Sequence, residues 1–136
     1  MPPVWLSQLA LVDAGDGKRF TLAADLAVSL DRETMLLAPA GMVTDGASIP
    51  RLFWRLVGSP WTGRYRRSAV IHDAAYQGWL VVSRPYVRTR EWADGVFLAL
   101  MASDRVSCLH RWIIYRAVRA CGGWAWQPQD HNHEPE

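Results

Sequence analysis

The sequence contains little cysteine and no long apolar run. Its 136 residues include two cysteines, Cys108 and Cys121, which are too few for a disulfide framework and not at the spacing of a zinc site. We therefore expect two buried free thiols, and a hydrophobic core that supplies the stability without a disulfide bridge. No apolar segment approaches the roughly 20 residues that a membrane-spanning helix needs, so we expect no transmembrane segment.

The sequence also begins without the features of an export signal. Its first residues, Met-Pro-Pro-Val-Trp, lack the basic start, the apolar segment and the cleavage site of a signal peptide, so we expect synthesis and retention in the cytoplasm. Half of the residues are hydrophobic and 21% are charged, which is typical of a globular protein. This length predicts one domain over residues 1–126, followed by a polar flexible tail at 127–136.

Arginine is concentrated in one part of the chain. Residues 51–119 contain twelve arginines and four acidic residues, although the net charge of the whole chain is only +2. Guanidinium groups bind phosphate well, in nucleic acids or in lipid headgroups, so Arg51, Arg67 and Arg90 are candidate contacts for an anionic substrate. Solvated helix faces with scattered ion pairs explain any single arginine equally well.

Periodicity predicts a mainly α fold with a small N-terminal β hairpin or meander, an α+β arrangement. Turn signals and short alternating runs within residues 1–50 indicate strands at about 19–22, 27–30 and 34–37. Helical spacing over residues 51–122 predicts a helical core, with helices at about 50–57, 64–79, 87–103 and 107–121. The residues at core spacing in the last helix are Leu109, Trp112, Ile113, Arg116 and Ala117.

The residues with catalytic potential lie on two of these predicted helices. His72 and Tyr76 are one helical turn apart and therefore share a face, and Asp94 lies on the packing face of the next helix. A carboxylate that holds one imidazole nitrogen protonated leaves the other nitrogen able to take a proton from water. The pattern therefore predicts a catalytic pair of His72 and Asp94.

Asp73 points about 100° away from the histidine around the same helix, and a cation site is predicted there. A loop rich in Asp, Gly, Ser and Pro precedes the helices at residues 42–50. Asp45 can supply a carboxylate to this site, and Gly46 or Ala47 a backbone carbonyl, which are oxygen ligands of the kind that calcium takes. A bound calcium ion would polarise a carbonyl or phosphoryl oxygen and stabilise the oxyanion formed when water attacks.

Each of these residues also has a purely structural interpretation. A single helical histidine is more often a hydrogen-bonded core residue, a tyrosine such as Tyr76 more often packs in a core, and an Asp-Gly pair is more often a simple turn. The carboxylates also have arginines nearby in the sequence, giving the pairings Asp73 with Arg67 or Arg51, and Asp94 with Arg90. Because all these residues occur together, a catalytic site is favoured over a separate structural explanation for each residue.

The motif His-Asp-x-x-Tyr, formed by His72, Asp73 and Tyr76, is followed about twenty residues later by Asp94. This arrangement resembles the catalytic core of the secreted phospholipases A2, particularly the prokaryotic enzymes, over roughly residues 42–122. The resemblance implies an antiparallel helix pair, with His72 as base, Asp94 as its support, Tyr76 behind them, and Asp73 and Asp45 as calcium ligands. The implied reaction is hydrolysis of the sn-2 ester of a glycerophospholipid. The chain departs from the pattern in lacking the disulfides of the secreted enzymes and the glycine-rich calcium loop of the animal enzymes.

The sequence also resembles a family of small uncharacterised proteins that are frequent in phages and prophages. The shared motifs are Thr-Asp-Gly-Ala-Ser-Ile-Pro-Arg at 44–51, His-Asp at 72–73 and Arg-x-x-Ala-Asp at 90–94. This resemblance implies a phage or prophage protein that is associated with the virion or released at lysis. Its implied partners are phage structural components, to which the phospholipase resemblance adds a phospholipid or membrane surface.

Three other functions compete with a phospholipase. A non-catalytic phage structural or host-interaction protein can use the same scaffold, because a fold does not guarantee turnover. A metal-dependent phosphohydrolase would need a histidine before the His-Asp pair, and no histidine precedes His72. Nucleic-acid binding is permitted by the arginines, but no recognised binding motif supports it. The sequence therefore predicts a calcium-dependent carboxylic ester hydrolase, with the structural role as the alternative.

Overall fold

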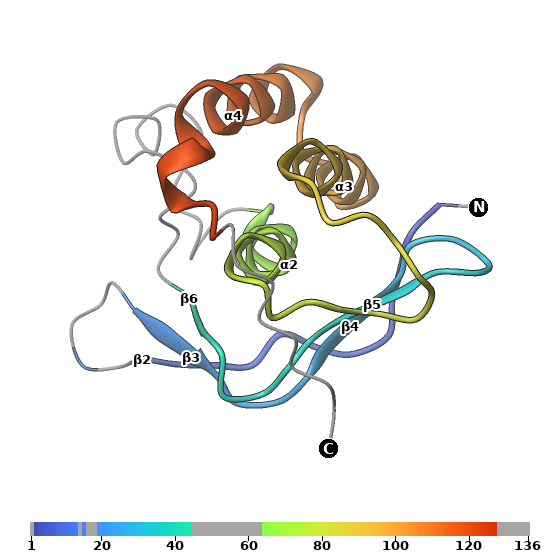
Figure 1. The fold of residues 1–136 in the computed structure, drawn as a ribbon, viewed down its shortest axis with the longest axis vertical. Coiled ribbons are helices and arrows are strands. Elements are labelled where there is room, and N and C mark those ends of the chain that lie inside the picture. Colours follow the sequence, from blue (N-terminus) through green and yellow to red (C-terminus); the bar gives the residue numbers. More distant parts are fainter. Residues whose placement is uncertain (1, 14, 16–18, 45–63, 128–136) are drawn as a thin grey trace.

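The structure, a computed structural model, describes residues 2–13, 15, 19–44 and 64–127. Within this part of the chain, seven strands form two antiparallel sheets, and three α-helices lie on one side of them (Figure 1). The prediction of a mainly helical protein with a small N-terminal hairpin is therefore wrong. The predicted helix at 50–57 lies outside the described residues, as does the predicted tail beyond residue 127.

The strands pair in two separate sheets. The first sheet has the order β1 (Val4–Trp5), β4 (Leu26–Ser29), β5 (Met35–Ala38) and β7 (Val81–Val82). The second sheet has the order β2 (Leu11–Asp13), β3 (Phe20–Leu22) and β6 (Val43–Thr44). Strands β3, β4 and β5 lie within one residue of the predicted strands. Strands β1, β6 and β7 have two residues each, which is too short for an alternating pattern to be recognised.

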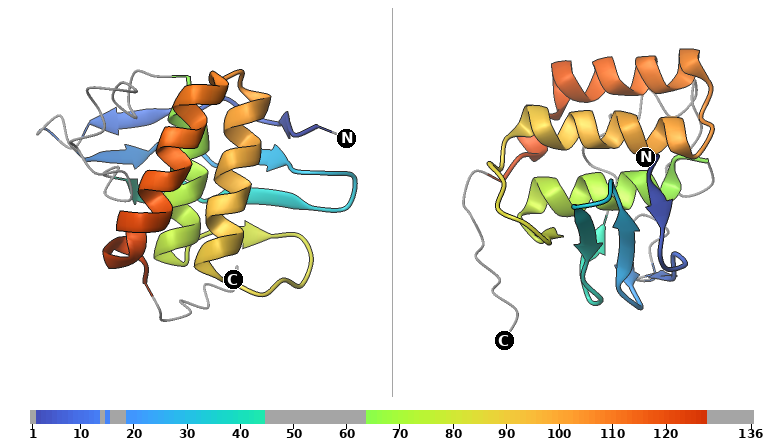
Figure 2. Two further views of the ribbon diagram at one scale, coloured as in Figure 1. Left: turned by 90° about the horizontal axis from the view of Figure 1, so that it is seen from above. Right: turned by 90° about the vertical axis from the view of Figure 1, so that its right-hand side faces the viewer.

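The three helices pack together on one side of the sheets, with α2 next to the strands and α4 farthest from them, and Figure 2 shows α2 and α3 running in opposite directions. Their bounds are α2 (Arg66–Gln77), α3 (Arg90–Ser103) and α4 (Cys108–Cys121), after which a 3-10 turn, η2 (Gly122–Ala125), closes the layer. Two side-chain caps fix where α3 and α4 begin: Thr89 Oγ1 accepts from Trp92 N at 3.0 Å, and Ser107 Oγ accepts from His110 N at 3.2 Å. No helix among the described residues is long and apolar enough to cross a membrane.

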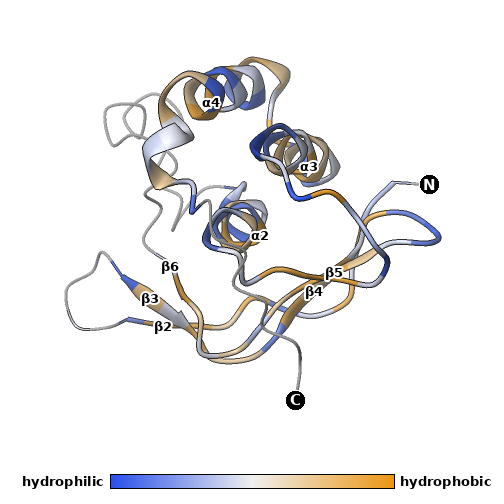
Figure 3. Ribbon diagram, in the orientation of Figure 1, coloured by the Kyte–Doolittle hydropathy of each residue, from blue (hydrophilic) through white to orange (hydrophobic). Residues whose placement is uncertain are grey.

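Helix α2 is the centre of the fold. One apolar cluster lies between α2 and the sheets and includes Leu26, Leu36 and Ile71; another lies between the helices and includes Ala69, Phe97 and Ile114. Figure 3 shows hydrophobic residues along β4 and β5, which lie beneath α2. Because both clusters pack on α2, every residue from Ser68 to Tyr76 is buried. The polar side chains of this segment must therefore find partners inside the protein.

The face of α4 that packs differs from the predicted one. Its buried residues are Ile114, Ala117 and Val118, whereas Leu109 is 70% exposed and Trp112 is 44% exposed. The apolar run from Trp112 to Val118 is nearly continuous, so helical spacing alone does not decide which stripe faces inward. Packing against the other helices therefore decides which residues of α4 are buried, and the buried stripe is rotated around the helix from the predicted one.

The two cysteines are free, as predicted, but they are exposed rather than buried. Cys108 and Cys121 are the first and last residues of α4. The two cysteines are thirteen positions apart along the helix, which places their Cα atoms about 20 Å apart, far beyond the span of a disulfide bridge. An intramolecular bridge is therefore excluded by the geometry of the helix.

The connection from α3 to α4 contains an arginine where glycine is usual. Arg105 has a φ of 62°, its N–H donates to Ala102 O, and Val106 N donates to Met101 O at 3.0 Å. These two bonds form a Schellman motif, whose left-handed position favours glycine because a Cβ atom is crowded there. Arg105→Gly is therefore expected to raise the free energy of unfolding by about 1 kcal/mol, measured by urea denaturation.

The exposed residue Arg116, inside α4, provides the matched control. The same replacement there, Arg116→Gly, should lower the free energy of unfolding by about 1 kcal/mol, since glycine is a poor helix former. A loss of stability in Arg105→Gly comparable to that in the control would contradict this interpretation of the connection.

Candidate functional site

His72, Tyr76 and Asp94 meet in the interior of the helical layer. Nε2 of His72 lies 2.7 Å from Oδ1 of Asp94, and the hydroxyl of Tyr76 donates to the same oxygen at 2.5 Å. The side chains of His72 and Asp94 are both 0% exposed. Because an ionised carboxylate only accepts hydrogen bonds, the nitrogen of His72 that faces Asp94 is the protonated one. In the neutral form of this imidazole, the basic lone pair is then on Nδ1.

The second oxygen of Asp94 is bound by the last turn of α4. Arg119 Nη1 lies 2.9 Å from Asp94 Oδ2, and the side chain of Arg119 is 29% exposed. Burial alone would raise the pKa of Asp94, but hydrogen bonds from His72, Tyr76 and Arg119 together lower it below its ordinary value. Burial and the hydrogen bond to Asp94 raise the pKa of Tyr76. Asp94 is therefore an ionised carboxylate that receives three side-chain contacts from two helices.

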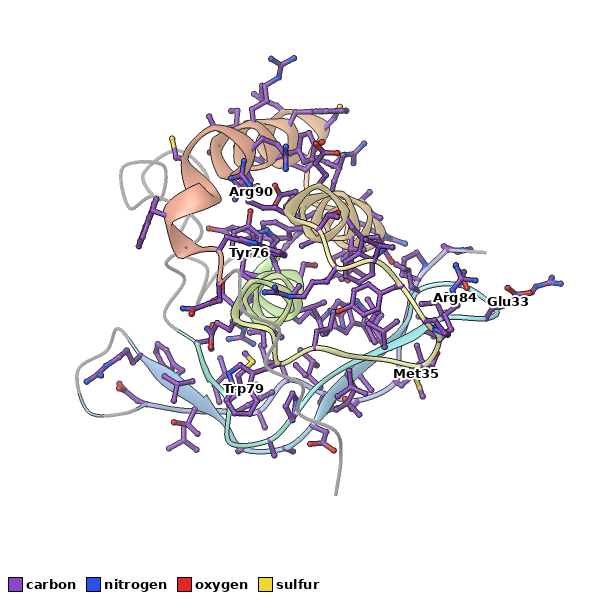
Figure 4. All side chains as sticks on the ribbon, in the orientation of Figure 1. Glu33, Met35, Tyr76, Trp79, Arg84 and Arg90 are labelled. Atoms are coloured by element: carbon purple, nitrogen blue, oxygen red, sulfur yellow. The ribbon has the colours of Figure 1, made fainter. Side chains whose placement is uncertain are left out.

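Aromatic rings hold the imidazole in place. The ring of His72 stacks on Phe97 with centroids 4.4 Å apart and an interplanar angle of 26°, and it lies 4.2 Å from the ring of Tyr76. The edge of Tyr76 meets Trp126 at 5.3 Å (Figure 4 labels Tyr76 on α2). These contacts restrict rotation of the imidazole and so support the orientation set by Asp94.

Asp73, the acidic residue of α2, faces the second sheet. Its carboxylate accepts a hydrogen bond from the hydroxyl of Thr44, on β6, and both residues are buried. The other predicted calcium ligands, Asp45, Gly46 and Ala47, lie outside the described residues. Among the residues that the structure describes, no group of three or more His, Cys, Asp or Glu residues could hold a metal ion. The carboxylate of Asp73 is an oxygen ligand of the kind that calcium prefers.

Two of the predicted anion contacts form hydrogen bonds with other residues of the protein. Arg67 forms a bidentate pair with Asp104, at 2.8 Å and 2.6 Å, rather than with Asp73. Arg90 donates to the backbone carbonyls of Val118 and Arg119 at 3.2 Å and 2.9 Å, rather than to Asp94 (Figure 4). Arg90 thus ties the start of α3 to the last turn of α4. Arg51, the remaining predicted contact, lies outside the described residues.

The elements that carry this site fall within one known sequence family. Residues 20–118 match the family described as "Protein of unknown function (DUF1353)". The chain belongs to the DUF1353 family. The matched region contains all the described helices except the last residues of α4 and the η2 turn, and thus His72, Tyr76 and Asp94.

Two relatives of this DUF1353 protein come from Sinorhizobium fredii (strain NBRC 101917 / NGR234). The uncharacterised protein y4jT is 37% identical over 62 residues, which cover 46% of this chain and 18% of the relative. The uncharacterised protein y4iH is 39% identical over 79 residues, covering 58% of this chain and 30% of the relative. The alignments therefore span less than a third of either relative. No solved structure matches this chain.

Two residues of the site in this DUF1353 protein are not indicated by the sequence motifs. Arg119 lies in the last predicted helix and Thr44 at the start of the predicted loop, yet they bind Asp94 and Asp73. One feature of the sequence could have indicated Arg119: it is a basic residue in the last turn of a predicted helix that ends at Gly122 and Gly123. Neither pairing can be derived from spacing along one helix, because each joins elements 25 or more residues apart.

The lowered pKa of Asp94 makes its contribution to stability depend on pH. A carboxyl group whose pKa is lower in the folded state than its ordinary 3.8 stabilises the protein above that value, and the contribution is lost as pH falls through the folded-state pKa. We expect the difference in unfolding free energy between the native protein and Asp94→Asn to be constant above about pH 5 and to shrink below about pH 4. Urea denaturation of both proteins at several pH values measures this difference. A difference that stays constant at low pH would contradict the lowered pKa of Asp94.

Proposed function

We propose that this protein hydrolyses a carboxylic ester of a glycerophospholipid, as phospholipases A2 do, with His72 as the general base. The observation that carries the proposal is the contact of His72 Nε2 with ionised Asp94 at 2.7 Å. With Nε2 donating to the carboxylate, Nδ1 is the nitrogen that takes a proton from water. The carboxylate of Asp94 then stabilises the positive charge that His72 gains.

The proposed reaction has two proton transfers. His72 removes a proton from a water molecule, whose oxygen forms a bond to the carbonyl carbon of the ester. The tetrahedral intermediate collapses, the bond to the glycerol oxygen breaks, and His72 returns the proton to that oxygen. Tyr76 and Arg119 are positioning residues, because they hold both oxygens of Asp94 at 2.5 Å and 2.9 Å and so fix the imidazole.

Calcium is proposed as the cofactor on the phospholipase resemblance and on the chemistry of Asp73. The carboxylate of Asp73, on α2, and the hydroxyl of Thr44, on β6, lie next to each other and offer oxygens that suit a hard cation. Calcium bound there would stabilise the oxyanion of the tetrahedral intermediate. The phage or prophage origin, with action in the virion or at lysis, likewise follows from the sequence resemblance.

The proposal is tested with phosphatidylglycerol vesicles whose lipid carries a labelled acyl chain at either the sn-1 or the sn-2 position. We expect fatty acid to be released from the sn-2 position in the presence of millimolar calcium, and release to stop when a chelator is added. Absence of release at both positions would overturn the proposal. If release continues in the presence of the chelator, calcium is not a cofactor of the reaction, and the proposed ester hydrolysis stands without it.

A non-catalytic phage structural or host-interaction role is the second candidate. It is favoured by one observation, the 0% exposure of the His72 side chain, which is expected of a histidine that only supports a core. Under this alternative, the folded protein releases no fatty acid from the vesicles, forms a stable complex with phage components, and retains that complex when His72 is replaced. The vesicle assay and the binding assay therefore give opposite results for the two candidates.

A further inference from the structure

A pocket of about 340 Å³ lies where α2 and α4 both begin. Figure 2 shows the first turns of these two helices at the same end of the helical layer. The residues that line the pocket are Arg64, Tyr65, Arg105, Val106, Ser107 and His110. Six residues along α2 separate Arg66 from His72, a rise of about 9 Å, so the pocket is distinct from the site around Asp94.

The pocket has a strong excess of positive charge. No acidic residue is among its described lining residues. The guanidinium groups of Arg64 and Arg105 form no hydrogen bond or ion pair with any other residue that the structure describes. The nearest carboxylate in sequence, Asp104, is already bound through both oxygens by Arg67 and also accepts from Trp5 Nε1 at 2.9 Å. It is therefore not available to neutralise Arg105.

The backbone conformation of Arg105 is a second observation that indicates a function for this pocket. Its φ of 62° belongs to the left-handed region that glycine adopts at lower energetic cost, yet an arginine occupies it. Strained residues cluster at sites where the side chain has a function. The first turn of α4 also borders the pocket through Ser107 and His110, and the amino end of a helix favours negative charge.

We infer that this pocket binds a phosphate group. Two guanidinium groups offer several N–H donors in a planar arrangement that matches phosphate oxygens, and together they balance the charge of a dianion. The phosphate can belong to a lipid headgroup or to a free phosphate compound, since both present the same oxygens. The inference does not depend on His72 acting as a base, and a failure to hydrolyse esters would leave it unaffected.

The test uses isothermal titration of the full-length protein with inorganic phosphate, and sedimentation with phosphatidic acid vesicles. We expect saturable phosphate binding that weakens at least about tenfold in Arg64→Gln and in Arg105→Gly, since each loses a charge-assisted contact. Arg105→Gly suits this test because glycine keeps the left-handed backbone. The matched control is Arg32→Gln, which removes the same charge at an exposed turn between β4 and β5 and should bind as the native protein does.

The two sources of phosphate are separated by competition. If the pocket holds a lipid headgroup, the vesicles bind and an excess of inorganic phosphate displaces them. If it holds a free phosphate compound, inorganic phosphate binds and the vesicles do not. The inference is overturned if inorganic phosphate does not bind saturably, or if Arg32→Gln weakens binding as much as the two pocket variants do.

Discussion

Replacing Asp94 by asparagine is expected to lower the free energy of unfolding by about 3 kcal/mol near neutral pH, and the melting temperature by roughly 10 °C. The carboxylate receives hydrogen bonds from His72, Tyr76 and Arg119 and is itself fully buried. Asparagine keeps the shape of the side chain but removes its charge, so the guanidinium of Arg119 loses this ion-pair partner. The asparagine NH2 group also replaces one carboxylate oxygen, and an NH2 group cannot accept the hydrogen bond that this oxygen received. Thermal and urea denaturation measure the effect.

Asp25→Asn is the control for this change. Asp25 is exposed and its Oδ1 accepts from the N–H of Ala40 at 2.8 Å, a bond that asparagine can also make. The control should therefore change the free energy of unfolding by less than about 0.5 kcal/mol. An Asp94→Asn protein that is as stable as the control would show that the buried carboxylate does not organise the helical layer.

The second large effect is expected on the reaction rate. Under the proposed function, His72→Gln lowers the rate of fatty acid release by roughly 100-fold to 10,000-fold, the usual contribution of a general base. Glutamine is chosen because its side-chain amide can still donate to Asp94, which preserves the fold while removing the basic nitrogen. The rate is measured with anionic vesicles, and circular dichroism confirms that the helices remain.

Arg32→Gln serves as the control here as well, because the residue is exposed on the turn between β4 and β5. Its rate should equal that of the native protein. If His72→Gln releases fatty acid as fast as this control, His72 is not the base, and the contact with Asp94 has a structural purpose only.

The part of the site carried by regular helices could be predicted from the sequence. His72 and Tyr76 share a face because they are four residues apart on α2, and Asp94 lies on the face of α3 that packs. The structure places all three within hydrogen-bonding distance. Their role in catalysis stays a prediction, since proximity alone does not establish turnover.

The features that depend on long-range packing could not be predicted. Arg119 reaches Asp94 because α4 packs on α3 in a register that Arg90 supports by binding the end of α4. The apolar residues of α4 are nearly continuous, so the helical period does not distinguish its stripes. The predicted stripe of Leu109, Trp112, Ile113, Arg116 and Ala117 shares only Ala117 with the buried residues. The two-residue strands form through pairing with distant partners rather than through a local pattern.

The most direct test of the central claim is hydrolysis of the phospholipid vesicles in water enriched in oxygen-18, followed by mass spectrometry of the products. If a water molecule activated by His72 attacks the ester carbonyl, the released fatty acid carries one oxygen-18 atom and the lysophospholipid carries none. Failure of the folded native protein to release fatty acid, or appearance of the label in the lysophospholipid instead, would contradict the account.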